Sequence, residues 1–244
     1  MDKPSGTGGA RRRTETEQLR ADLAAARAEL DKLTAMLREQ ETFSRRSERR
    51  LLESMEGAVI AVANAIESRD PFKAGHGTRV ADLAAGIGRE VGLPEERVRG
   101  IRLAASIHDI GEIHIPVEIL IKPGRLTNIE MTIMVTHCQA GYEILKHLDF
   151  PWPIAQTVMQ HHELLDGSGY PLKLQGEEIL LESCIVTVAN VVAAMTAHRA
   201  FLPAASIDVA LAEIMKFRGV KFNPQVVDAC VKLFREKGYG LPQD

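Results

Sequence analysis

Residues 74–109 read AGHGTRVADLAAGIGREVGLPEERVRGIRLAASIHD, and the spacing of their apolar side chains predicts two consecutive helices. One face of the first helix is expected to carry His76, Val80, Leu83, Ile87 and Val91. The segment Gly92-Leu-Pro94-Glu-Glu then supplies a stop for this helix and a start for the next one. The second helix runs into His108-Asp109 at its C-terminal end.

The rest of the chain has similar signals for the starts and ends of helices. Thr127 and Glu130 have the spacing of a capping box, and the helix that they open would turn four residues inward: Met134, His137, Gly141 and Ile144. Three further helices are expected: a short one carrying Ile154, Val158 and His161, a buried one over 182–198 that holds Asn190, and a last one opened by Asn223-Pro224. Long alternating strand patterns are absent, and aromatic residues make up only 5% of the chain. The predicted fold class is all-α.

The N-terminal region has a pattern of its own. Residues 1–13 are rich in Gly and Arg without large apolar side chains, which predicts a disordered tail. Residues 14–57 are predicted to form a coiled-coil or linker helix, because apolar residues recur at alternating spacings of four and three: Leu19, Leu23, Ala26, Leu30, Leu33 and Leu37. A parallel homodimer is expected, with a helix that folds back on the downstream domain as the alternative. Residues 58–236 would form the main domain and 237–244 a C-terminal tail.

The bulk composition excludes several classes of protein. A chain of 244 residues with 45% hydrophobic and 26% charged residues is typical of a globular protein. A net charge of −3 provides no basic surface for duplex nucleic acid or an anionic membrane. Three widely spaced cysteines argue against a disulfide framework and favour a reducing compartment: Cys138, Cys184 and Cys230. No apolar run is long enough to span a membrane, so a cytoplasmic location without a membrane anchor is expected.

Polar residues recur on helix faces that should point into the core. They are in phase with apolar neighbours on their own helices: His76, His137, His161 and Asn190. His108-Asp109 lies at the end of another predicted helix. One such histidine is usually satisfied by a neighbour in the core, but several helices that each offer a polar residue favour a shared divalent cation. Imidazole combined with carboxylate suits iron, manganese, nickel or zinc.

These residues lie in strings that resemble a known family. The strings are Asp70-Pro-Phe-Lys-Ala-Gly-His76, His108-Asp109-Ile-Gly, Ile115-Pro116-x-x-Ile119-Leu120, Lys122-Pro-Gly and His161-His162-Glu-x-x-Asp166-Gly-Ser-Gly-Tyr170-Pro171. In order and spacing they resemble the HD-GYP branch of the HD phosphohydrolases, over residues 58–233. The resemblance implies a helical HD-domain bundle that follows the coiled-coil helix. It also implies a bacterial signalling enzyme that hydrolyses cyclic di-GMP or a related nucleotide.

The resemblance assigns the metal ligands by position. They would be His108, Asp109, His137, His161 and Asn190, with Asp109 bridging two metals. His76 and His162 resemble ligands of a third metal, but Phe72 stands where a further carboxylate would be needed, so two metals are expected. Iron or manganese is implied, with nickel, zinc and magnesium as alternatives. Two such ions can activate a bridging hydroxide and stabilise the leaving oxygen of a phosphodiester.

The resemblance also implies substrate contacts. Arg199 matches a phosphate-binding arginine, although a charge at the end of a surface helix is an equally good interpretation. The other implied contacts are Lys122, Asp166, Gly169 and Tyr170. The loop from Asp166 to Pro171 would also offer a surface to protein partners such as diguanylate cyclases.

Four departures from the family pattern lie close to this chemistry. Asn190 replaces a metal-binding Asp, Glu112 replaces the Lys of the string His-Asp-x-Gly-Lys, Leu202 replaces a second basic residue and Cys138 replaces a Pro. One hypothesis keeps a metal-dependent phosphodiesterase, with Asp109 and Glu112 as catalytic residues and Glu112 positioning or deprotonating water. The alternative is a weakened domain that binds a nucleotide or a protein and signals through its coiled coil. A helical interaction scaffold is a third reading.

Overall fold

The computed structural model describes residues 7–197 and 204–241. Within these ranges the chain forms helices joined by loops, and strand-like pairing is limited to isolated bridges, which confirms the predicted all-α class. The chain divides into two compact units, residues 1–54 and 55–244. No helix in the described part of the chain combines the length and the apolar character that crossing a membrane requires.

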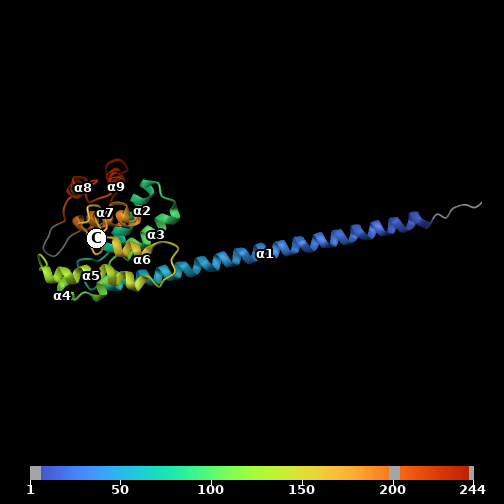
Figure 1. The fold of residues 1–244 in the computed structure, drawn as a ribbon, viewed down its shortest axis with the longest axis horizontal. Coiled ribbons are helices and arrows are strands. Elements are labelled where there is room, and N and C mark those ends of the chain that lie inside the picture. Colours follow the sequence, from blue (N-terminus) through green and yellow to red (C-terminus); the bar gives the residue numbers. More distant parts are fainter. Residues whose placement is uncertain (1–6, 198–203, 242–244) are drawn as a thin grey trace, which may run out of the picture. The chain divides into compact units, whose positions relative to one another are not determined.

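Helix α1 (Thr7–Glu67) supplies the described part of the N-terminal unit (Figure 1). It begins earlier than expected, so residues 7–13 do not belong to the predicted disordered tail. Ala10 and the three arginines that follow it have high helix propensities, which explains the extension. The side chains of the predicted seam are exposed on this helix, with Leu19 at 66% and Leu30 at 63%.

The C-terminal unit begins with the end of α1 and continues through shorter helices (Figure 1). These are α2 (His76–Val91), α3 (Glu95–Ser106), η1 (Ile110–His114), α4 (Val117–Leu120), α5 (Asn128–Leu145), α6 (Ile154–Gln160), η2 (Gly176–Glu178), α7 (Leu181–Thr196), α8 (Ile207–Lys216) and α9 (Pro224–Glu236). The predicted capping box at Thr127 is confirmed, since its hydroxyl accepts a hydrogen bond from the Glu130 N–H. Asn223 caps α9 in the same way.

Two hydrophobic cores stabilise the C-terminal unit. The larger one joins α2, α7, α8 and α9, and the smaller one joins the end of α1 with α5 and α6. Helix α3 contributes to both, through Ile101 on one side and Leu103 on the other. The segment directly after α3, which carries His108-Asp109, therefore lies where the two cores meet.

The buried face of α5 differs by one residue from the predicted face. Ile144 is 38% exposed, whereas Leu145 is 1% exposed and packs in the smaller core. Met134 is only partly buried, while His137 and Gly141 are buried as expected. The expectation for Ile144 was wrong because the contacts of α5 with η1 and α6 centre its inner face one position later. The three cysteines are buried free thiols, as predicted.

Candidate metal centre

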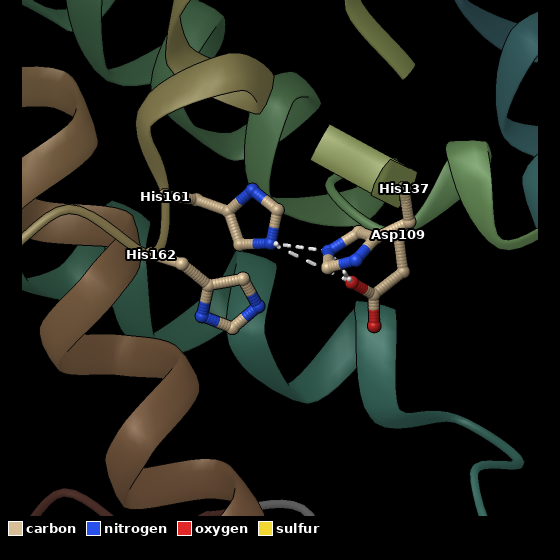
Figure 2. Close-up of side chains that lie close together, drawn as sticks. All are labelled: Asp109, His137, His161 and His162. Carbon is tan, nitrogen blue, oxygen red and sulfur yellow. Dashed lines mark hydrogen bonds and ion pairs between the residues drawn. The ribbon is translucent and has the colours of Figure 1, made fainter. Parts of the chain in front are cut away.

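Five histidines and one aspartate converge from separate segments of the C-terminal unit. Two sets of potential ligands form, and within each set the ligand atoms lie within 4.8 Å of one another. One set comprises Asp109, His137, His161 and His162, and the other comprises His76, His108 and Asp109. Figure 2 shows the first set, with the rings of His137 and His161 turned toward the Asp109 carboxylate. Asp109 belongs to both sets.

The two carboxylate oxygens of Asp109 face different histidines. Its Oδ2 atom lies 3.3 Å from Nε2 of His108. Its Oδ1 atom lies 3.5 Å from Nε2 of His137 and 3.6 Å from Nε2 of His161. One oxygen therefore serves each ligand set, which is the arrangement that a carboxylate needs in order to bridge two cations.

Backbone hydrogen bonds fix the orientation of three of these imidazoles. The Nδ1 atoms of His108, His137 and His161 each contact a carbonyl oxygen three residues earlier in the chain. These oxygens belong to Ala105, Met134 and Val158, at 2.7, 2.7 and 2.6 Å respectively. Because a carbonyl can only accept, each Nδ1 carries a proton and each Nε2 is left to face Asp109.

The remaining nitrogen atoms lack protein partners that suit them. The Nε2 atoms of His137 and His161 lie 3.3 Å apart, and two lone pairs at this distance repel each other unless a proton or a cation lies between them. Among the described residues, buried Nε2 of His108 has no hydrogen-bond partner. Imidazole nitrogens and carboxylate oxygens with these orientations fit a transition-metal cation.

The protonation states also suit metal binding. Burial lowers the pKa of His76 to about 3 and that of His137 to about 4, so both rings are neutral near pH 7, as a ligand must be. Burial opposes ionisation of Asp109, but His108 and Lys73 hold its pKa well below the usual range. His108 is the exception. Burial opposes its charge, but the Asp109 carboxylate raises its pKa, so His108 would have to release a proton when a cation binds.

Asn190 reaches the second ligand set through His76. Its Oδ1 atom lies 3.0 Å from Nε2 of His76, across 114 positions of the chain. The structure therefore places Asn190, on α7, beside the set formed by His76, His108 and Asp109. An amide at this place offers a dipole to a cation, where a carboxylate would offer a full charge.

A cleft of about 790 Å³ opens onto the ligands. Several predicted site residues line it together: His76, Asp109, Glu112, Lys122, His137, His161, His162, Tyr170 and Asn190. The ring of His162 lies between His161 and Tyr170, with centroid distances of 4.1 and 4.6 Å. Burial raises the pKa of Tyr170, so its hydroxyl stays protonated. A cleft of this size is suited to a nucleotide-sized ligand.

Two of the predicted substrate contacts, Asp166 and Gly169, do not line this cleft. Asp166 is exposed, and its Oδ1 atom accepts hydrogen bonds from the backbone and hydroxyl of Ser168, which makes it part of a turn. Gly169 is buried against its own loop, where a Cβ atom would lie 2.5 Å from the Leu164 nitrogen. Asp166 and Gly169 thus have structural roles within their loop, and their contact with substrate stays a prediction. Arg199 and Leu202 lie outside the described residues.

Lys73 is a member of the site that the sequence analysis missed. Its Nζ atom lies 2.8 Å from Oδ2 of Asp109 and 2.5 Å from Oε1 of Glu112. Glu112 stands where the family pattern has a Lys, and its charge is paired here with an ammonium group. Burial and Asp109 together raise the pKa of Glu112 to about 7 despite this ion pair. The proximity of Lys73 to His76 in sequence was the only available signal.

Glu163 is a second residue without an expected role. It directly follows the double histidine and is buried. Its carboxylate accepts hydrogen bonds from the backbone N–H groups of Leu172, Lys173 and Leu174, at 2.6, 3.1 and 3.1 Å. Glu163 thereby fixes the end of the loop that carries Tyr170.

Comparison with known proteins identifies the family. Residues 61–226 match the family described as HD domain, which is more than half of the chain. The chain therefore belongs to the HD-domain family. The chain is also 38% identical, over 218 residues, to the cyclic di-GMP phosphodiesterase response regulator RpfG of Xanthomonas campestris, covering 84% of this chain and 58% of that protein. These matches confirm the resemblance to the HD-GYP branch.

Solved structures support the same fold. The HDGYP protein Bd1817 of Bdellovibrio bacteriovorus gives a TM-score of 0.55 at 19% identity, covering 66% of this chain and 51% of that one. A cyclic GMP-AMP specific phosphodiesterase of Vibrio cholerae, V-cGAP3, gives 0.59 at 21% identity, covering 74% and 49%. The chain thus spans only about half of the length of these proteins.

Proposed function

We propose that this chain is a metal-dependent phosphodiesterase that hydrolyses cyclic di-GMP at a binuclear centre. The observation that carries the proposal is the Asp109 carboxylate, which presents one oxygen to each of two histidine sets and lines a nucleotide-sized cleft. RpfG is named for hydrolysis of the same substrate. V-cGAP3 is named for cyclic GMP-AMP, which makes that nucleotide the related substrate to compare.

Each of the two ligand sets would hold one cation. One cation would be held by Asp109, His137 and His161 with His162 adjacent, and the other by Asp109, His108 and His76 with Asn190 adjacent. When bound, two divalent cations such as iron or manganese supply a charge that activates water and stabilises the leaving oxygen. Sequence considerations leave nickel, zinc and magnesium as alternatives.

Protein groups would hold the nucleotide in the cleft. Tyr170 lies beside the His162 ring and lines the cleft. Lys122 lines it too, with its Nζ atom paired with Glu130. Glu112 lies among these groups, and its pKa of about 7 suits a residue that exchanges a proton near neutral pH. Its proposed role of positioning or deprotonating water remains a prediction.

A weakened domain that binds a nucleotide without rapid turnover is the second candidate. Asn190 favours it, because an amide replaces a charged ligand beside His76. Turnover that needs two cations would fall if one were held weakly, while binding of the nucleotide would persist.

Metal analysis of anaerobically purified protein, combined with hydrolysis assays, separates the two candidates. The enzyme hypothesis expects two transition-metal ions per chain and conversion of cyclic di-GMP to a linear product, with cyclic GMP-AMP assayed alongside. If a sample that holds both metals binds the nucleotide but forms no product, the enzyme hypothesis is refuted and the nucleotide-binding hypothesis is supported.

The exposed seam on α1 supports a further proposal, that the chain forms a homodimer through a parallel coiled coil. Leucines that are about two-thirds exposed on an isolated helix, such as Leu19 and Leu30, lose this unfavourable exposure when a second helix packs on them. A protein partner at the loop of Gly169, Tyr170 and Pro171, and a cytoplasmic location, remain predictions from the sequence.

A further inference from the structure

An ammonium group lies directly beside the proposed metal ligands. Lys73 reaches Asp109 from the loop before α2, and its Nζ atom is 2.8 Å from Oδ2, the same oxygen that faces His108. Glu112, which lies in η1, accepts a hydrogen bond from the same ammonium group. The side chain of Lys73 is 23% exposed and that of Glu112 is 6% exposed, and both line the cleft.

The charges of these three residues depend on one another. The carboxylates of Asp109 and Glu112 both contact the Lys73 ammonium. Without a cation between them, these two carboxylates would repel each other and any phosphate that enters the cleft. Partial burial of the Lys73 ammonium is itself costly, and the two carboxylates offset that cost. Although burial opposes it, Asp109 and Glu112 raise the pKa of Lys73, so the ammonium remains charged.

The hydrogen-bond capacity of Lys73 is not exhausted by these contacts. An ammonium group has three N–H donors. Within the described ranges, its hydrogen-bond acceptors are the carboxylates of Asp109 and Glu112. One donor therefore remains for an acceptor in the cleft. A non-bridging oxygen of a phosphodiester is an acceptor of the right charge.

We infer that Lys73 binds a phosphate oxygen of the substrate, and that Glu112 is a positioning residue that holds the ammonium in place. The cation that the HD-GYP pattern carries at position 112 would thus be supplied here from position 73, while position 112 has become its acidic partner. The inference rests on the proposed function only in that the ligand contains a phosphodiester. It turns Glu112 from a departure that weakens the site into half of a working ion pair.

Phosphate binding tests this inference without requiring turnover. Protein loaded with manganese is titrated calorimetrically with inorganic phosphate, and its metal content is measured on the same sample. Lys73→Met removes the charge at similar length and should raise the Kd of phosphate about tenfold, with metal content unchanged. Lys232→Met is the matched control, because Lys232 on α9 forms an ion pair with Glu90 on α2, at 2.6 Å. Its phosphate Kd should equal that of the unmodified protein.

Two further variants separate the role of Glu112 from a general effect on folding. Glu112→Gln should raise the phosphate Kd by a smaller factor, because the amide still accepts a hydrogen bond but no longer fixes the ammonium by charge. The exchanged pair, Lys73→Glu with Glu112→Lys, should return the Kd to within about threefold of the unmodified protein. Lys73→Gln replaces Lys73→Met if thermal unfolding shows that the methionine variant does not fold.

Several results would overturn the inference. A phosphate Kd within about twofold of the unmodified value in Lys73→Met would show that the ammonium does not bind phosphate. A gain or loss of metal in that variant would show that Lys73 acts on the cations instead. If the exchanged pair still binds phosphate weakly, Glu112 does not position the ammonium. Assays with cyclic di-GMP on the same samples keep the two proposals apart, since phosphate affinity can depend on Lys73 in a protein that hydrolyses nothing.

Discussion

The backbone of Gly111 in η1 packs so closely against His137 in α5 that a Cβ atom on Gly111 would lie 1.9 Å from the His137 carbonyl oxygen. The same atom would lie 2.5 Å from the nitrogen of Gly141, one turn further along α5. The glycine that follows His108-Asp109 in the sequence therefore has a steric purpose. It lets the helix that carries His137 approach the segment that carries Asp109.

Gly111→Ala should separate these segments and disturb the site. We expect a loss of about 1–3 kcal/mol in the free energy of unfolding, together with weaker metal binding, because α5 must move to admit the methyl group. Chemical denaturation and metal analysis measure the two effects. Gly57→Ala is the control, since nothing lies within 4 Å of the added atom on the exposed face of α1 and alanine favours the helix. Equal stability of the two variants would contradict the steric argument.

Much of this architecture was predictable because it depends on local signals. Capping residues such as Thr127, and the helical spacing of His76 and His137 among apolar neighbours, are written in short windows of sequence. The inner face of α5 was harder, because adjacent residues lie only about 100° apart on a helix and the packing partner decides between Ile144 and Leu145.

The contacts that escaped prediction join distant positions. Lys73 meets Glu112 across 39 positions, and an ion pair of this kind follows from the packing of η1 against the loop before α2. Glu163 was visible in its string, but its function depends on three backbone N–H groups whose direction only the folded loop defines. Asp166 shows the converse, since its place in a characteristic string suggested a ligand contact and the structure gives it a turn.

Glu163 should control the rigidity of the loop that carries Tyr170. Glu163→Ala leaves three backbone N–H groups without their charged acceptor, and we expect a loss of about 2–4 kcal/mol in the free energy of unfolding. Cleavage of residues 164–175 by a protease should become faster as well. Glu177→Ala, at an exposed position in η2, should change neither quantity. An unchanged cleavage rate in Glu163→Ala would mean that the loop is held by other contacts.

Removal of a ligand histidine should release metal. His161→Ala and His137→Ala each remove an Nε2 atom that faces Oδ1 of Asp109. Each variant should weaken metal binding at least tenfold, because even residues that only orient a metal ligand change the affinity by about tenfold or more. Each variant should also be less stable than the unmodified protein. Metal analysis after dialysis and thermal unfolding provide the readouts, with the exposed His147→Ala as control. Full metal retention by both variants would refute the proposed ligand set.

The exposed seam of α1 makes a prediction about oligomeric state. Leu30→Asp combined with Leu33→Asp should convert a dimer to a monomer, because two charges would be buried at each position where the helices meet. Ala28→Asp with Ala35→Asp adds the same charge away from the seam and should leave the dimer intact. Light scattering at micromolar concentration measures both. A monomeric unmodified protein would show that the seam has another use.

Asn190 decides how strongly the second cation is held. Its Oδ1 atom reaches His76 at 3.0 Å, so a carboxylate at this position would add a full negative charge beside the set of His76, His108 and Asp109. Charge at short range inside a protein is a far stronger ligand than a dipole. Asn190→Asp should therefore raise the metal content toward two per chain and raise phosphodiesterase activity with it. Asn128→Asp adds the same charge at the exposed start of α5 and should change neither.

The two readouts of Asn190→Asp separate the possible causes of a weak enzyme. A rise in metal content and activity together would assign the weakness to the missing carboxylate. If metal content rises while activity stays absent, the second cation is not what limits the chain, and a nucleotide-binding role becomes the better account of the intact cleft. If the unmodified protein already holds two metals and hydrolyses cyclic di-GMP rapidly, the amide oxygen of Asn190 is a sufficient ligand. The charge that Asp109 shares between both histidine sets is then enough to retain the second cation.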